Sequence, residues 1–395
     1  MNELFSNRIS NVSPSFIREI LKIAVDPSII SFAGGLPNLD LFPVADLQKA
    51  SNDLFNDAGA EILQYTSTEG YLPLRERIAA DYKTKGIEVD VDEILITNGS
   101  QQGLDLLGKA LLNEGDNVLI EEPGYLGAIQ AFEIYAANFI PVAVGEDGMD
   151  VESLKKAMVG ANAKLMYTVP NFQNPSGISY TNENRKAVAD VISAVNTLII
   201  EDNPYGELRF SGEEKQSFKS LLPDQTVLLG SFSKVVVPSF RLGWIVAPKM
   251  LMDKLVIAKQ AADLHTNYFC QRVLDRFLQD NDLNLHIQKI IDVYGHQKAV
   301  MESAIAKYFP KEVTYFDAEG GMFLWAKLPE GMSAMKLFDV AIKEKVAFVP
   351  GDPFYVTKRD LNTFRLNFSS ADPAVIEEGM QRLGKVLHQF VADNT

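Results

Sequence analysis

A lysine that follows two hydroxyl side chains and precedes an arginine is the most reactive combination in this sequence. Ser231, Ser233 and Lys234 end the run Gly230–Lys234, and Arg241 follows seven residues later. A lysine amine can form a Schiff base with an aldehyde, while hydroxyls and a guanidinium can hold an anion beside it. Pyridoxal 5'-phosphate (PLP) carries both groups. The run therefore indicates a PLP site, against the simpler alternative of charged residues on a surface loop.

Other polar residues follow predicted strands in the same way. Ser100 and Gln101 open a predicted helix, where free N–H groups suit a phosphate, although a serine there is also a common helix cap. Asn174 and Tyr205 can donate to the phenolate oxygen of PLP, and Asp202 can keep its pyridine nitrogen protonated. A turn explains each of these three residues equally well by itself. Their shared position after strands makes a common site the better explanation.

Short apolar strands alternate with helical segments through the middle of the chain. This alternation predicts a mainly parallel sheet with helices on both faces. Such sheets bind ligands at the carboxyl ends of their strands, where the polar residues lie. The expected strands are 93–97, 118–120, 164–169, 197–201, 227–230 and 242–247.

The pattern changes near residue 250, where a long helical stretch extends to about residue 308. The segment after it mixes short strands with helices, as a smaller α+β domain does. The fold class predicted is α/β, with a large PLP-binding domain at 46–290 and a small C-terminal domain at 291–395. We expect the N-terminal segment, 1–45, to join the small domain.

Composition excludes several classes of function. Against 37 Lys and Arg stand 52 Asp and Glu, and a formal net charge of −15 disfavours nucleic acid or an anionic membrane as partner. No apolar run is long enough for a membrane helix, and the start of the chain has no apolar signal core. The single cysteine, Cys270, fits a reducing compartment, so we expect a cytoplasmic enzyme. The four histidines show no metal-ligand spacing, so no metal is expected.

Taken together, the motifs resemble those of fold-type I PLP-dependent aminotransferases of class I/II. Within that class the chain is similar to bacterial α-aminoadipate aminotransferases and to kynurenine aminotransferase II. The resemblance covers nearly the whole chain. It rests on the segments 15–21, 32–37, 64–65, 99–102, 174–177, 230–234 and 262–266.

The resemblance implies further roles. Tyr125 would stack on the cofactor ring, Arg241 would pair with its phosphate, and Tyr65 would reach the phosphate of the neighbouring subunit in a homodimer. Arg365 would bind the substrate α-carboxylate, beside Asn174 and Gly35. The residues themselves support the role of Arg365, because an arginine inside an apolar strand needs an anion; a buried salt bridge is the alternative.

The N-terminal helix bears on the choice of substrate. Its apolar positions share one face, whereas Ser15 and Arg18 lie off that face. In the similar aminoadipate enzymes, residues at these positions line the distal end of the substrate. The resemblance thus implies 2-aminoadipate or glutamate as amino donor, together with aromatic or large apolar amino acids, and 2-oxoglutarate as an acceptor. A solvated surface arginine is the alternative for Arg18.

Two other functions compete with amino-group transfer. A PLP-dependent β-lyase on the same fold would keep the cofactor residues and eliminate a substrate side chain. A ligand-sensing regulator would fuse a winged helix–turn–helix to the fold. We expect no such fusion here, because the aminotransferase-like segment begins near Ser13 and the chain is acidic.

Overall fold

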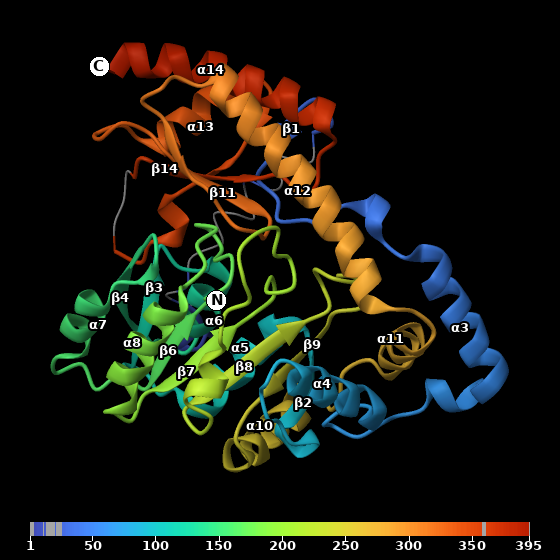
Figure 1. The fold of residues 1–395 in the computed structure, drawn as a ribbon. Helices are drawn as coiled ribbons and strands as arrows, with labels where there is room; N and C mark the ends of the chain where they lie inside the picture. Colours follow the sequence, from blue (N-terminus) through green and yellow to red (C-terminus); the bar gives the residue numbers. More distant parts are fainter. Residues whose placement is uncertain (1–3, 11, 13–19, 21–25, 358–360, 395) are drawn as a thin grey trace.

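A large twisted sheet forms the body of the molecule in the computed structural model, which describes residues 4–10, 12, 20, 26–357 and 361–394 (Figure 1). It has eight strands, and the predicted ones are present within two residues of their expected ends. In spatial order they are β2 (Ile94–Asn98), β9 (Leu242–Val246), β8 (Thr226–Ser231), β7 (Leu198–Asp202), β6 (Leu165–Thr168), β3 (Asn117–Glu122), β4 (Asn138–Gly145) and β5 (Gly148–Met149).

The predicted fold class is confirmed, with a mixed rather than uniform sheet. Strands β8, β7, β6, β3 and β4 are parallel, whereas β9 runs antiparallel to β2 and β8. The sequence did not predict β4 or β5. Strand β4 lies next to the short strand β5 at the sheet's end, and Val142 is its one buried residue. Residues 139–144 of β4 are apolar, but Pro141 lies within this run, and a proline there argues against a strand.

Helices cover both faces of this sheet. Alternate residues of the central strands point to opposite sides. Leu119 and Met166 pack in a core with residues of α7 and α8, whereas Ile120 and Tyr167 pack in a larger core with α5 and α6. The helices of this part are α3 (Val44–Ala58), α4 (Leu72–Thr84), α5 (Gly99–Leu111), α6 (Leu126–Glu133), α7 (Val151–Met158), α8 (Asn182–Ser193), α9 (Phe218–Leu221), α10 (Lys249–Ala262) and α11 (Tyr268–Asp280).

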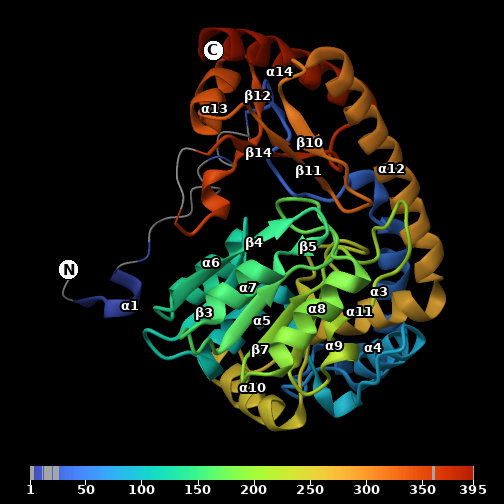
Figure 2. The same ribbon diagram turned by 60° about the vertical axis from the view of Figure 1, so that its left-hand side comes forward.

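A smaller sheet stands beyond the carboxyl ends of the large one (Figure 2). Its antiparallel strands are β10 (Thr314–Phe316), β11 (Phe323–Lys327), β14 (Thr363–Asn367) and β13 (Val349–Pro350). The long helix α12 (Leu283–Tyr308) runs from the large part to this sheet, where α13 (Ala334–Lys343) and α14 (Pro373–Asn394) complete the layer. A Cβ at Gly384 would lie 2.4 Å from the Tyr308 carbonyl oxygen, so glycine allows α14 to approach α12 closely.

The N-terminal segment reaches this smaller part. Strand β1 (Ile30–Ser31) pairs in parallel with β12 (Val346–Ala347). Domain boundaries at 45 and 290 stay predictions. The predicted helix after Ser13 lies outside the described residues except for Ile20, which is buried. The remaining short elements are α1 (Asn7–Ser10) and 3-10 turns at Leu39–Leu41, Gly59–Leu63, Val91–Glu93 and Asp352–Phe354. Among the helices described, none is long and apolar enough to cross a membrane.

Candidate active site

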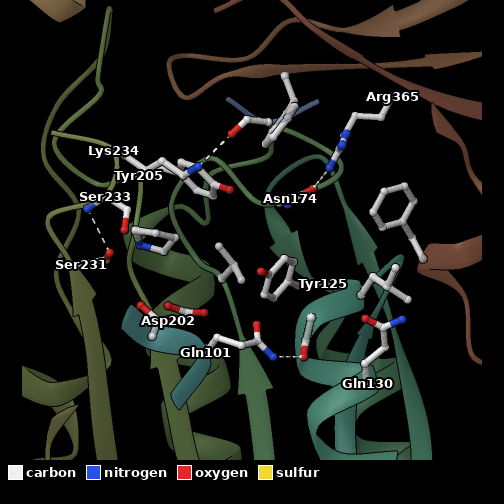
Figure 3. Close-up of a pocket in the computed structure, with 18 of the residues that line it drawn as sticks. Gln101, Tyr125, Gln130, Asn174, Asp202, Tyr205, Ser231, Ser233, Lys234 and Arg365 are labelled. Carbon is white, nitrogen blue, oxygen red and sulfur yellow. Dashed lines mark hydrogen bonds between the residues drawn. The ribbon is translucent and has the colours of Figure 1, made fainter. Parts of the chain in front are cut away.

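A cavity of about 450 Å³ lies between the carboxyl ends of the large sheet's strands and the smaller sheet (Figure 3). Of the predicted site residues that the structure describes, Tyr65 does not line it and lies elsewhere on the chain's surface. Ser15 and Arg18 fall outside the described residues. The predicted residues that do line it are Gly35, Ser100, Gln101, Tyr125, Asn174, Asp202, Tyr205, Ser231, Ser233, Lys234, Arg241 and Arg365.

Lys234 enters the cavity from the loop that follows β8. Its Nζ donates a hydrogen bond of 2.8 Å to the Gly35 carbonyl oxygen (Figure 3). Burial, together with the positive charges of Arg365 and Arg241, lowers the pKa of this amine to about 8. A lysine with a lowered pKa is a good nucleophile and base near neutral pH, because a larger share of it is uncharged. The structure thus gives Lys234 the properties that a Schiff-base lysine needs.

Asp202 ends β7, and only one of its two carboxylate oxygens has a hydrogen-bond partner among the described residues. Tyr167 Oη donates to its Oδ2 at 2.8 Å, while Oδ1 is buried with no hydrogen-bond partner among the described residues. Burial raises the pKa of this carboxyl to about 7, although the Tyr167 hydrogen bond acts in the opposite direction. No cation compensates the carboxylate within the described part of the chain. A protonated ring nitrogen at Oδ1 would supply both the missing donor and the missing charge.

Arg365 projects from β14 into the same cavity and is only 4% exposed. Its guanidinium donates to Asn174 Oδ1 at 2.5 Å and to the Ala33 carbonyl oxygen at 2.7 Å. It also lies 4.2 Å from the centre of the Phe323 ring, and burial lowers its pKa to about 10. No carboxylate pairs with it in the described residues, so the buried salt bridge considered from the sequence is not found. Its charge is left available for an incoming anion.

A second group of donors meets at the first turn of α5. Ser100 lies inside the helix and Asn98 is the capping residue, so the helix-cap explanation of Ser100 is wrong. The Arg241 guanidinium covers this turn closely: a Cβ added to Gly99 would lie 2.5 Å from its Nη2. Arg241 also donates to Ser233 Oγ at 3.4 Å. Helix N–H groups, hydroxyls and a guanidinium together form a suitable cradle for a phosphate.

Two tyrosines complete the walls. Tyr205 is buried and meets Phe323 edge-on, with ring centres 5.9 Å apart. Tyr125 precedes α6 and lies nearly parallel to Tyr167, with ring centres 6.5 Å apart. Burial raises the pKa of Tyr125 to about 12 and holds that of Tyr205 well above its ordinary value. Both phenols therefore stay protonated at neutral pH and can act as hydrogen-bond donors.

Tyr167, Phe323 and Phe354 also line the cavity, and the sequence reasoning did not single them out. A signal existed for Tyr167. It is a tyrosine within an apolar strand, and a buried tyrosine hydroxyl needs a hydrogen-bond partner. Register then supplies the partner, because Tyr167 pairs with Ile200, two residues before Asp202. The two phenylalanines carry no comparable signal, since their role depends on how the two sheets meet.

The donor set fits PLP on three observations. Asp202 Oδ1 is buried without a hydrogen-bond partner among the described residues, so a positively charged donor fits there. The donors at Gly99 and Arg241 suit a phosphate, and the Lys234 amine lies in the same cavity. No group of His, Cys, Asp and Glu suited to hold a metal ion occurs in the described part of the chain.

Comparison with known proteins leads in the same direction. A family model described as aminotransferase class I and II matches residues 28–383. The 2-aminoadipate transaminase of Thermus thermophilus is 39% identical over 395 residues, which cover 99% of this chain and 98% of that protein. Aromatic-amino-acid aminotransferase 1 of Thermococcus litoralis is 38% identical over 392 residues, covering 98% and 94%. The crystal structure of Pyrococcus horikoshii kynurenine aminotransferase with PMP has a TM-score of 0.94 at 38% identity, covering 98% and 97%.

Proposed function

The chain belongs to the class I and II aminotransferases, and from this premise we propose that it passes an amino group from 2-aminoadipate, glutamate or a large apolar or aromatic amino acid to 2-oxoglutarate. As a member of this family it is a PLP-dependent transferase. One cavity carries the proposal, because it brings together three groups. They are the Lys234 amine with its lowered pKa, the buried Asp202 Oδ1 and the Arg365 guanidinium; among the described residues, Oδ1 has no hydrogen-bond partner and Arg365 has no carboxylate partner.

Each wall of the cavity would hold a different part of the cofactor. Ser100, Gln101, Ser231, Ser233 and Arg241 would bind the phosphate, and Tyr125 would cover the ring. Asp202 Oδ1 would accept from the ring nitrogen. Because the Asn174 oxygen accepts from Arg365, its amide nitrogen is the group that meets the Tyr205 hydroxyl, and both groups would donate to the phenolate oxygen.

Different side chains would bind the substrate and transfer its proton. Bound PLP supplies an electron-withdrawing ring that stabilises negative charge on the amino acid's α-carbon. Arg365 would fix the α-carboxylate with two parallel hydrogen bonds. Lys234 Nζ, which is uncharged more often near neutral pH than an exposed lysine, would take the α-proton and return it to the cofactor carbon on the other side of the amino nitrogen. The carbonyl of Gly35 holds this amine in place by its 2.8 Å hydrogen bond.

An amino-acid panel with 2-oxoglutarate as acceptor tests the proposed function. With 2-oxoglutarate, the purified enzyme should form glutamate from 2-aminoadipate and from the large apolar or aromatic donors. With glutamate as donor, it should convert 2-oxoadipate to 2-aminoadipate. Without any oxo acid, one amino-acid substrate should convert the bound PLP to its amine form in a single turnover. A β-lyase would instead release a side-chain fragment and keep PLP. The two relatives at 38% and 39% identity are named as an aminotransferase and a transaminase, which favours amino-group transfer over elimination.

Removing Arg18 should separate the two classes of donor. Loss of one charge-assisted hydrogen bond to a side-chain carboxylate costs about 1.5–3 kcal/mol, roughly 10- to 150-fold in kcat/KM. We expect this loss in Arg18→Ala for 2-aminoadipate and glutamate, and little change for leucine or phenylalanine. Arg8→Ala, which removes the same charge from an exposed position of α1, is the control. An equal effect on both classes, or none on either, would refute the side-chain role of Arg18.

We also propose a homodimer that shares its active sites. Tyr65 is 77% exposed and lies outside the cavity of its own chain. The neighbouring Leu63 is 67% exposed, and a hollow of about 300 Å³ beside them is lined mainly by apolar and aromatic residues. Such a patch is more typical of an interface than of a solvated surface.

Mass measurement by light scattering at assay concentration should give twice the chain mass of 43.8 kDa. Leu63→Asp should shift the protein toward monomer and lower its activity in parallel, because burying a charge in an interface is costly. The control Val159→Asp changes a residue that is 83% exposed at the end of α7, far from α3 in Figure 1, and should leave the mass unchanged. A fully active monomer would contradict the shared site.

A further inference from the structure

A polar network lies directly behind the first turn of α5. Its centre is the carboxylate of Asp263, the residue that ends α10. Oδ2 of this carboxylate accepts from Asn98 Nδ2 and from Gln102 Nε2, both at 2.6 Å. Lys259 Nζ donates to its two oxygens at 3.0 and 3.1 Å, and the Lys259 side chain is fully buried. The segment 262–266 is one of the motifs noted in the sequence, and no step assigned above uses it.

Gln102 extends the network to the backbone. Its side-chain oxygen accepts from the backbone N–H of Asn98 at 2.8 Å and from Lys259 Nζ at 2.8 Å. Asp263 therefore holds both side chains that flank the turn containing Ser100 and Gln101. The positive charge of Lys259 balances that of Asp263, so the network adds little net charge beside an anion site.

The network changes how Asn98 meets the N-terminus of α5. Asparagine is among the best capping residues, because its oxygen can accept from the free N–H groups of the first turn. Asn98 occupies the cap position of α5, yet its side chain makes no capping hydrogen bond. It is bound to Asp263 instead. The N–H groups of the first turn, which have no partners within the helix, are thereby left for another acceptor.

We propose that Asp263 is a positioning residue for the cofactor phosphate. It draws Asn98 away from the helix end, so the first-turn N–H groups near Ser100 and Gln101 stay open to the phosphate. Without Asp263, the Asn98 side chain is released and competes with the phosphate as a cap. This inference rests on the proposed placement of PLP, with its phosphate at the first turn of α5.

The test measures the affinity of PLP for cofactor-free protein through quenching of the fluorescence of the chain's two tryptophans. Asp263→Ala should weaken binding by about tenfold or more, because charge-assisted hydrogen bonds to the phosphate are replaced by the competing cap. The double variant Asp263→Ala with Asn98→Ala should recover most of this loss, since alanine cannot cap. Asp53→Ala, which removes an exposed ion pair with Lys49, is the control and should bind PLP like the wild type.

The rescue separates positioning from a merely structural role. If Asp263 only supported the fold, the double variant would bind PLP at least as weakly as Asp263→Ala, and the proposal would be overturned. Unchanged affinity in Asp263→Ala would overturn it as well. Should Asp263→Ala fail to fold, as judged by circular dichroism, Asp263→Leu, which has no acceptor oxygen and keeps more of the side-chain volume, gives the same comparison with and without Asn98→Ala. Wild-type protein that binds no PLP would instead refute the proposed function itself.

Discussion

Replacing Lys234 by alanine is expected to lower kcat for transamination by roughly 10²- to 10⁴-fold, the usual contribution of a positioned general base. The physical reason is that Lys234 Nζ is the one amine that lines the cavity among the described residues, held there by the Gly35 carbonyl oxygen at 2.8 Å. Treating the wild-type enzyme with borohydride should fix the cofactor on Lys234, as seen by peptide mass. Lys254→Ala, an exposed lysine on α10, should keep full activity. Cofactor fixed on another lysine would refute this role.

The pH dependence of Lys234 follows from the same geometry. Its pKa is lowered to about 8 by burial, so the uncharged amine accumulates as pH rises through 8, whereas an exposed lysine stays charged to about pH 10.4. In cofactor-free protein, an amine-reactive reagent should therefore modify Lys234 with a rate that reaches half its plateau near pH 8. Peptide mass after brief labelling at several pH values measures this rate. A half-plateau near that of the exposed Lys254 would contradict the lowered pKa.

Arg365→Met is expected to lower kcat/KM by roughly 10²- to 10⁴-fold, which corresponds to about two charge-assisted hydrogen bonds. Methionine keeps part of the apolar volume against Phe323 and loses the charge that would hold the α-carboxylate. PLP content should be unchanged, because Arg365 is not among the groups placed around the phosphate or the ring nitrogen. Steady-state kinetics and the absorbance of the bound cofactor measure the two effects separately.

Stability supplies an independent signature for Arg365. A buried cation without a carboxylate partner is unfavourable, so removing it should leave the melting temperature of cofactor-free protein unchanged or higher. Arg365→Lys is the matched control: it keeps the charge and loses the fork of parallel donors, so its activity should lie between the other two. Loss of activity accompanied by equal loss of melting temperature would mean that Arg365 serves the fold rather than the substrate.

Much of this site could be predicted from the sequence because its residues follow strands. One of them, Asp202, ends a strand, and two others, Lys234 and Ser100, follow the ends of strands. Parallel strands bring their carboxyl ends to one edge of the sheet. Strand β4 could not be predicted in this way, because Pro141 lies within its apolar residues 139–144 and a proline there argues against a strand.

Other features depend on contacts that local patterns do not encode. The unpartnered oxygen of Asp202 exists because Tyr167 occupies the other one. The lowered pKa of Lys234 depends on burial beneath Gly35, a residue far away along the chain. Tyr65 is exposed and lies outside its own cavity, so its proposed role depends on contacts with a second chain.

The pairing of β1 with β12 also governs when the enzyme can become active during synthesis. Residues 30–31 bond to residues 346–347, and the Arg365 guanidinium bonds to the Ala33 carbonyl oxygen 332 positions away. A chain growing on the ribosome can therefore form its large sheet early, whereas the wall above the cavity needs β12 and β14, which follow much later in the sequence. Contacts of such long separation form slowly, because a large loop must be closed first. Binding of the cofactor in its complete pocket is thus expected only after β12 and β14 have been synthesised and have made these contacts.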